Sequence, residues 1–129
     1  MTVELKMLAC SIVFGIVSVL LAGALTTAER GALWNLGNRD GEVKPLTGAA
    51  ARAERASRNF LETFPFFAAA ALAVVVAQRH SASTALGAQL YFWGRFVYLP
   101  VYVLGIPYLR TLIWAVSFAG LLMLVTALF

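Results

Sequence analysis

The sequence from Arg52 to Pro65, Arg-Ala-Glu-Arg-Ala-Ser-Arg-Asn-Phe-Leu-Glu-Thr-Phe-Pro, joins a charged helical face to the start of a long apolar segment. At about 100° per residue, five of its polar side chains fall within one arc of roughly 120°. These side chains are Arg52, Arg55, Arg58, Asn59 and Glu62. From Phe60 to Ala77 the chain is almost wholly apolar and long enough to enter a bilayer. Because a charge at that depth costs about 2.5–3.5 kcal/mol on insertion scales, we expect the polar face to line a bundle interior or a cavity.

The composition is that of a membrane protein with a single domain. Of the 129 residues, 61% are hydrophobic and only 12% are charged, a balance outside the range of soluble domains. Four apolar segments, each with the roughly twenty residues that cross a bilayer as a helix, span residues 5–28, 57–78, 84–104 and 108–129. The sequence therefore predicts an all-α integral membrane protein, built as a bundle of four transmembrane helices.

The basic residues are distributed unevenly between the connections. The predicted first and third connections carry Arg30, Arg39, Lys44 and Arg110. The opposite side offers only Lys6 and Arg79. The positive-inside rule therefore predicts cytoplasmic first and third connections, with both termini outside.

Two other classes of function have no support in the sequence. The net charge of +4 and the pI near 9.7 come without the basic run or aromatic platform that nucleic-acid binding requires. The lone Cys10 excludes an internal disulfide and offers no metal cluster. We expect neither a nucleic-acid partner nor a metal site.

The third predicted span has a polar line of its own. Its members fall within about 60° of one another on a helical wheel and are Tyr91, Arg95, Tyr98 and Tyr102. Arg95 lies near the middle of the span, where its guanidinium is too deep to reach the interface easily. One interpretation is a structural ion pair between Arg95 and Glu62. At the start of the fourth span, Arg110 either belongs to the same polar cluster or is an ordinary interfacial cation.

The cations in or near these segments outnumber the acids. The cations are Arg52, Arg55, Arg58, Arg95 and Arg110, and the acids are Glu54 and Glu62. Surplus guanidinium groups in a low-dielectric cavity favour an anionic ligand, and their paired donors suit a carboxylate or a phosphate. A small zwitterion with excess negative charge fits this pattern. Anionic lipid headgroups are the alternative, and they account better for Arg52 and Arg110 than for Arg95.

The second predicted span resembles a motif of a known family. Arg55-Ala-Ser-Arg58-Asn59-Phe-Leu-Glu62-Thr-Phe-Pro65 is similar to the second-helix motif of the MAPEG family, the membrane-associated proteins in eicosanoid and glutathione metabolism. The likeness is to its bacterial-type members and extends over most of the chain. It implies a homotrimer of four-helix subunits, with glutathione bound between neighbouring subunits near the cytoplasmic side. From the short chain without targeting extensions we expect a bacterial inner membrane.

The resemblance also assigns roles to individual residues. Those implied to bind glutathione are Arg55, Arg58, Asn59, Glu62, Arg95, Tyr98 and Tyr102, of which Arg95 matches the glycine-arginine pair of the prostaglandin synthase branch. Arg110 matches the arginine assigned to activation of the glutathione thiol. The chain departs from the family pattern at Thr63, where the leukotriene synthase branch has a tyrosine. It departs again at Trp114, where the prostaglandin synthase branch has one.

The implied chemistry is physically reasonable. A free thiol with a pKa near 8.5 is only about 3% thiolate at pH 7, and a guanidinium beside the sulfur favours the anion. We therefore expect a glutathione-dependent transferase or peroxidase that acts on lipophilic electrophiles from the bilayer, with glutathione as the thiol cosubstrate. A non-catalytic protein of the same fold that binds lipid-soluble ligands is the second hypothesis. A structural membrane protein whose arginines contact anionic lipids is the third.

Overall fold

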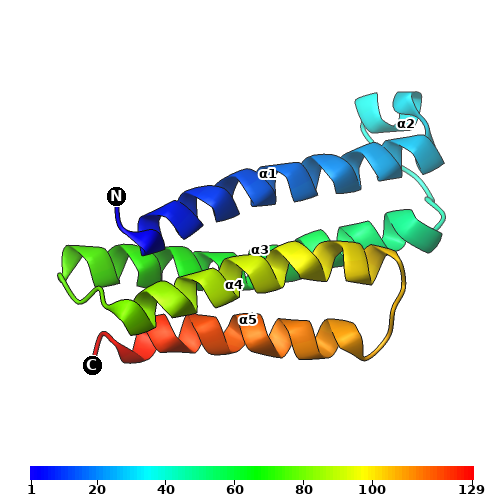
Figure 1. Ribbon diagram of the computed structural model, residues 1–129. Coiled ribbons are helices and arrows are strands. Elements are labelled where there is room, and N and C mark those ends of the chain that lie inside the picture. The colour runs from blue at the N-terminus through cyan, green and yellow to red at the C-terminus, as the bar shows by residue number, and fades with distance from the viewer.

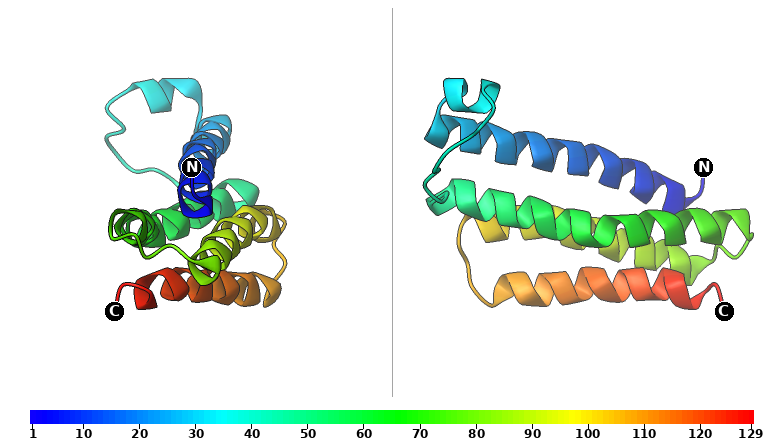
Figure 2. Two further views of the ribbon diagram at one scale, coloured as in Figure 1. Left: turned by 60° about the vertical axis from the view of Figure 1, so that its left-hand side comes forward. Right: turned by 180° about the vertical axis from the view of Figure 1, so that it is seen from behind.

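The computed structural model describes all 129 residues and contains only helices. Four long helices form an antiparallel bundle: α1 (Val3–Arg30), α3 (Gly48–Val76), α4 (Ala82–Val103) and α5 (Leu109–Thr126) (Figure 1). The short helix α2 (Ala32–Leu36) belongs to the first connection and projects away from the bundle (Figure 2). The predicted all-α fold class is confirmed.

The chain ends share one end of the bundle. Both termini and the turn between α3 and α4 lie there, whereas α2 and the turn between α4 and α5 lie at the other end (Figure 1). Hydrogen bonds close both ends: Arg79 Nη1 donates to the carbonyl of Ala127 over 3.2 Å, and Arg52 Nε donates to the carbonyl of Val103 over 2.8 Å. The first and third connections thus lie at the same end of the bundle.

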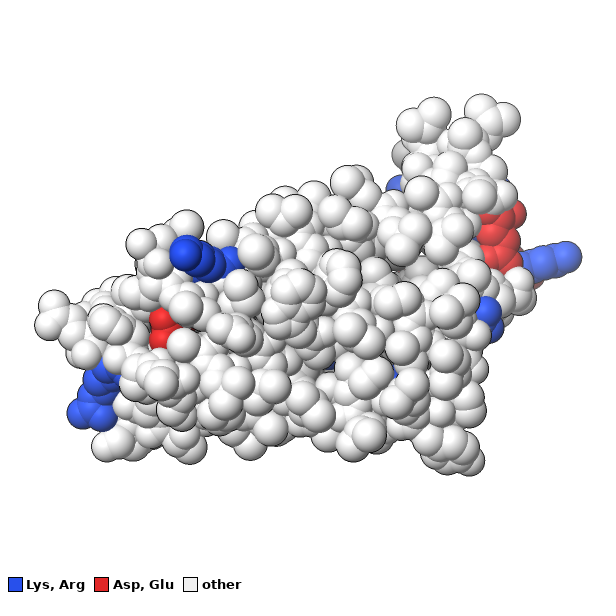
Figure 3. Space-filling model, in the orientation of Figure 1, with Lys and Arg blue, Asp and Glu red and all other residues white.

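Three of the helices, α1, α3 and α5, are long and apolar enough to cross a membrane. Charged side chains gather towards the two ends of the bundle, and the face between them is nearly free of charge (Figure 3). Helix α4 has a comparable length of 22 residues, but it carries Gln89 and Arg95 and is not among the three. The chain is therefore a membrane protein built as a helical bundle, and a crossing by α4 stays a prediction.

Helix boundaries follow local signals in the sequence. Thr2 caps α1, and a capping box formed by Ser81 and Thr84 begins α4. Pro65 and Pro100 lie inside α3 and α4, as the predicted segments require. Helix α3 begins well before the predicted segment 57–78, so the arginine-rich stretch and the apolar stretch form one helix of 29 residues. Helix α2 was not predicted from the sequence.

Small residues bring α4 and α5 together. A methyl group at Gly87 would lie 2.7 Å from the carbonyl oxygen of Gly120, and a methyl group at Gly120 would collide with the carbonyl oxygen of Gly87. Only glycine lets two helix backbones approach so closely, as in membrane helix pairs with small residues at their interface. This contact fixes the position of α5, and therefore of Arg110, relative to α4.

The aromatic core lies between α1, α3 and α4. Phe67 and Tyr91 are both almost completely buried, and their rings stack with centroids 4.0 Å apart. Phe60 contacts Phe14 edge to face at 5.3 Å. These rings pack the apolar face of α3 into the core. The polar face of α3 is therefore turned towards the last turns of α4 and the first turn of α5.

A buried carboxylate links the beginnings of α1 and α4. Glu4 is only 2% exposed, and its Oε1 accepts a hydrogen bond of 2.5 Å from the hydroxyl of Thr84, which is itself completely buried. A hydrogen bond to a charged group contributes about 1.5–3 kcal/mol, and a buried acceptor left without its donor is costly.

We therefore expect Thr84→Val to lower the free energy of unfolding by about 2 kcal/mol, since valine keeps the shape of threonine but can neither donate to Glu4 nor accept from the Ser81 N–H of the capping box. Unfolding followed by circular dichroism in detergent measures the change. Thr126→Val is the matched control, because the hydroxyl of Thr126 is exposed and bonds only to its own helix. Equal effects of the two substitutions would contradict the stabilising role of the Glu4–Thr84 contact.

Candidate functional site

The polar face of α3 meets α4 and α5 at a hollow of about 230 Å³. Seven side chains line this hollow, and all seven are candidate site residues from the sequence analysis. They are Arg55, Arg58, Asn59, Glu62, Tyr98, Tyr102 and Arg110. We call this feature the arginine hollow. Residues from three helices converge in it, at the end of the bundle that carries the first and third connections (Figure 1).

Helical spacing places the α3 residues in the hollow. Arg55, Arg58, Asn59 and Glu62 follow one another at intervals of one, three or four residues, so they share one face of α3. The apolar side of the same helix is anchored in the core, where Phe60 is 3% exposed. Burial of that side therefore determines the direction in which the charged side points.

Tyr102 lies between two guanidinium groups. Arg55 Nε donates a hydrogen bond of 3.0 Å to the Tyr102 hydroxyl, and the guanidinium of Arg110 lies 4.6 Å from the centre of the Tyr102 ring. A cation over an aromatic face is attracted by the ring quadrupole. The Tyr98 ring is 5.5 Å from that of Tyr102 and completes the wall. The tyrosines thus hold Arg55 and Arg110 in place without neutralising them.

The lining of the arginine hollow has an excess of positive charge. It holds three guanidinium groups and a single carboxylate, that of Glu62. Arg58 forms an ion pair of 3.0 Å with Glu54, but the two side chains are 68% and 45% exposed, and such a surface pair contributes at most about 1 kcal/mol. Glu62 has no ion-pair partner in the chain. The hollow therefore favours an anion with several hydrogen-bond acceptors.

Arg95 is the one candidate residue that does not line the arginine hollow. It lies behind the hollow, buried between α3 and α4, with 2% of its surface exposed. The ion pair with Glu62 considered from the sequence is absent. The Arg95 guanidinium instead donates to Asn59 Oδ1 at 2.7 Å and to Thr63 Oγ1 at 2.7 Å. The physical reason is the rotation of α4 against α3, which directs Arg95 towards the inner side of the polar face.

Two smaller hollows adjoin the arginine hollow and share Arg110 with it. One, of about 200 Å³, lies between Arg52 and the turn from Gly105 to Pro107, and the other, of about 180 Å³, extends along α5 to Trp114. The turn was missed as a part of the site. Its signal is Gly105, which has a φ of 76° that favours glycine and where an added methyl group would lie 3.6 Å from the Arg52 side chain.

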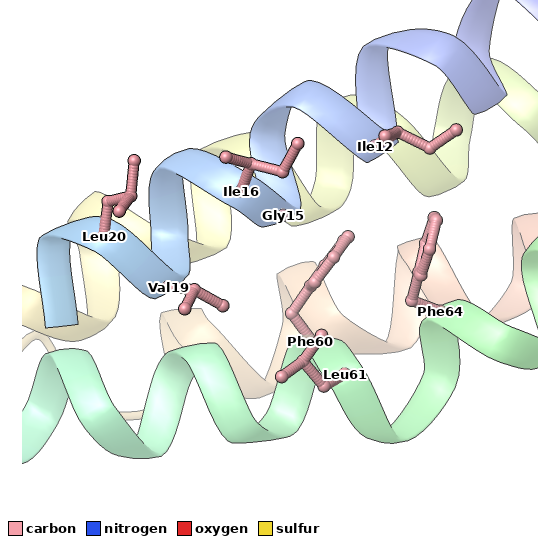
Figure 4. A pocket seen from close by; sticks show the side chains of 8 residues that line it. All are labelled: Ile12, Gly15, Ile16, Val19, Leu20, Phe60, Leu61 and Phe64. Carbon is pink, nitrogen blue, oxygen red and sulfur yellow. The ribbon is translucent and has the colours of Figure 1, made fainter. Parts of the chain in front are cut away.

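An apolar hollow of about 320 Å³ lies on the other side of α3, against α1. In Figure 4, Phe60 and Phe64 point from α3 towards α1, and Val19 points from α1 back towards α3. The remaining lining residues are Ile12, Gly15, Ile16, Leu20 and Leu61. Because Phe60 and Leu61 stand between Asn59 and Glu62 in the sequence, the apolar hollow and the arginine hollow lie at the same level of the bundle.

Comparison with known proteins gives one match. No curated protein matches the chain, and no solved structure does. The MAPEG family model matches residues 7–129, which is nearly the whole chain. The protein is therefore a member of the MAPEG family, the membrane proteins of glutathione and eicosanoid metabolism.

Proposed function

We propose that this protein is a glutathione-dependent membrane transferase or peroxidase that acts on lipophilic electrophiles. The observation that carries the proposal is the arginine hollow, in which three guanidinium groups and one carboxylate face the same space. Glutathione has two carboxylates and one ammonium group. Its carboxylates suit the guanidinium forks of Arg55 and Arg58, and Glu62 is the acid that can accept its ammonium group.

Arg110 is the residue that activates the thiol. Its guanidinium is held over Tyr102 and lines all three polar hollows, so it is central to the space that the peptide would fill. A cation beside the sulfur lowers the thiol pKa. The thiolate then attacks an electrophilic carbon and forms the carbon–sulfur bond, while the leaving group departs with its electron pair. With a hydroperoxide, two thiols become one disulfide, and the peroxide becomes an alcohol and water.

The apolar hollow suits a lipophilic molecule from the bilayer, but it does not place that molecule beside the thiol, which would lie on the other side of α3. This hollow has almost no polar lining and lies across α3 from the arginine hollow at the same level (Figure 4). Pockets of a few hundred Å³ with apolar walls are typical of small-molecule sites. A substrate that partitions into the bilayer would reach this side of the bundle directly.

The proposed arrangement in the membrane is a homotrimer of four-helix subunits in a bacterial inner membrane. Helix α4 is the fourth crossing, with the first and third connections in the cytoplasm and both termini outside, as the distribution of arginine and lysine favours. Membership in a family whose proteins are generally oligomeric supports the trimer. The exposure of Arg58, at 68% of its side chain, also supports a neighbouring subunit, because a charge beside lipid requires cover.

Calorimetric titration with glutathione tests the binding part of the proposal. We expect glutathione to bind and its dimethyl ester to bind at least about tenfold more weakly, because the ester lacks the charges that the arginines recognise.

Equal affinity for the acid and the ester would contradict recognition by the guanidinium groups. The same samples are then assayed with a generic lipophilic electrophile. Tight binding of glutathione without turnover would favour the non-catalytic ligand-binding protein of the same fold. Absence of binding would leave the anionic lipid headgroup as the partner of these arginines.

A further inference from the structure

Arg95 is a buried cation with neutral partners only. The side chain is 2% exposed, and no carboxylate lies within ion-pair distance of it. Its Nη1 donates to Asn59 Oδ1 at 2.7 Å, and its Nη2 donates to the Asn59 backbone carbonyl at 2.9 Å and to Thr63 Oγ1 at 2.7 Å. The rings of Tyr91 and Tyr98 lie 5.9 Å and 5.3 Å from the guanidinium. A buried charge without a counter-ion is costly, so its contacts need a further reason.

The contacts of Arg95 determine how the Asn59 amide is turned. A guanidinium has donors only, so the atom of Asn59 that faces it must be the oxygen. The amide nitrogen occupies the opposite corner of the planar group and points away from Arg95. This Nδ2 forms no hydrogen bond with the chain and is not among the buried unpaired atoms. Because Asn59 lines the arginine hollow beside Tyr98 and Arg110, the hollow receives an N–H donor at this point.

We propose that Arg95 is a positioning residue that acts through Asn59. By holding the amide oxygen, it presents the Asn59 N–H to the arginine hollow and selects a ligand group that accepts hydrogen bonds, such as a carboxylate or a peptide carbonyl. This rests on the proposed function in so far as the ligand is glutathione. The guanidinium also polarises the Asn59 amide. A hydrogen bond that the amide oxygen accepts from a charged donor strengthens the hydrogen bond that the amide N–H then donates.

The Asn59→Asp variant separates positioning from simple structural support. Aspartate has nearly the same shape, and its carboxylate pairs with Arg95, so the contact between α3 and α4 is kept or strengthened. The hollow, however, loses its N–H donor and gains an acceptor that repels an anion. We expect the melting temperature to equal or exceed that of the wild type, while glutathione affinity falls at least about tenfold.

The matched control is Asn35→Asp. Asn35 also accepts from an arginine, because Arg39 Nη2 bonds to its Oδ1, but the pair lies in the first connection and outside the arginine hollow. This variant should bind glutathione as the wild type does. A stable Asn59→Asp protein that binds glutathione normally would overturn the inference.

A double-mutant cycle on stability tests the orientation without any ligand. In Arg95→Met the cation is removed, so Asn59→Asp should lower the melting temperature in that background, opposite in sign to its effect in the wild type. Equal effects in both backgrounds would overturn the contact between Arg95 and the Asn59 oxygen. If the wild type itself fails to bind glutathione, the proposed function and the choice of ligand fall, and the cycle alone still decides the orientation.

Discussion

Arg110→Ala should lower the rate of glutathione conjugation at pH 7 by about 25-fold, as the thiolate fraction falls from about three quarters to about 3%. The reason is the thiol: a guanidinium that shifts its pKa by two units contributes about 2.7 kcal/mol to the thiolate. In the arginine hollow, Arg110 lies 4.6 Å from the centre of the Tyr102 ring and shares its lining with Arg55. Arg110→Lys keeps the charge but not the planar fork, and it should retain an intermediate rate.

The pH profile distinguishes thiol activation from a binding defect. With the wild type, the rate should level off above about pH 7, because a thiol whose pKa is lowered by two units is mostly ionised there. With Arg110→Ala, it should rise about tenfold per pH unit until the ordinary thiol pKa near 8.5 is reached. Ultraviolet absorbance of the bound thiolate gives the same comparison directly.

Arg79→Ala, at the far end of the bundle, is the control for the removal of a guanidinium. If Arg110→Ala keeps the wild-type rate and pH profile, Arg110 has no part in activating the thiol. If it loses glutathione binding but keeps its turnover at saturation, its role is recognition instead.

Gly120→Ala should destabilise the bundle by about 3 kcal/mol, at the upper end of the usual cost of overpacking. The added methyl group would meet the carbonyl oxygen of Gly87 and lie 2.8 Å from the backbone nitrogen of Tyr91. Neither is the movable end of a side chain. The helices α4 and α5 must therefore separate, which also displaces Arg110 from α4.

Gly23→Ala is the matched control, because a methyl group at Gly23 in α1 meets no atom within 4 Å. That substitution should be neutral or stabilise by up to about 1 kcal/mol, since alanine is the better helix former. Thermal unfolding of the two variants in the same detergent measures both effects. Equal melting temperatures would mean that α4 and α5 are not held together by the glycine contact.

Much of the fold could be predicted from the sequence, because hydrophobic length is a local property. Each of the four predicted apolar segments overlaps one long helix. The start of α3 and the existence of α2 could not be predicted in this way. The first turns of α3, from Gly48 to Arg58, bury only small side chains, those of alanines and Ser57, beside their charged residues, which a search for long apolar segments does not register. Helix α2 has only five residues, between Gly31 and Gly37.

The candidate site could also be predicted only in part from the sequence. Helical periodicity places Arg55, Asn59 and Glu62 on one face, and the structure brings that face to Tyr102 and Arg110. Helical periodicity gives the direction of a side chain around the axis of its own helix. It does not give the position of the neighbouring helix along that axis, nor its rotation. For this reason the wheel could not show that Arg95 bonds to Asn59 rather than to Glu62.

The count of surplus cations changes for a similar reason. Arg52 was counted among the guanidinium groups that need an anion, but its Nε donates to the carbonyl of Val103 at the end of α4. A backbone carbonyl left free at a helix end is a good acceptor for arginine. Sequence patterns register charges and miss such neutral acceptors, because these depend on which helix ends meet.

Both chain termini lie at the end of the bundle that is farthest from the arginine hollow (Figure 1). An affinity tag or a fluorescent reporter at Met1 or Phe129 would therefore stand clear of the route into the arginine hollow. Protein immobilised on a surface by either extremity would keep that route open, and the two tethering geometries would be interchangeable.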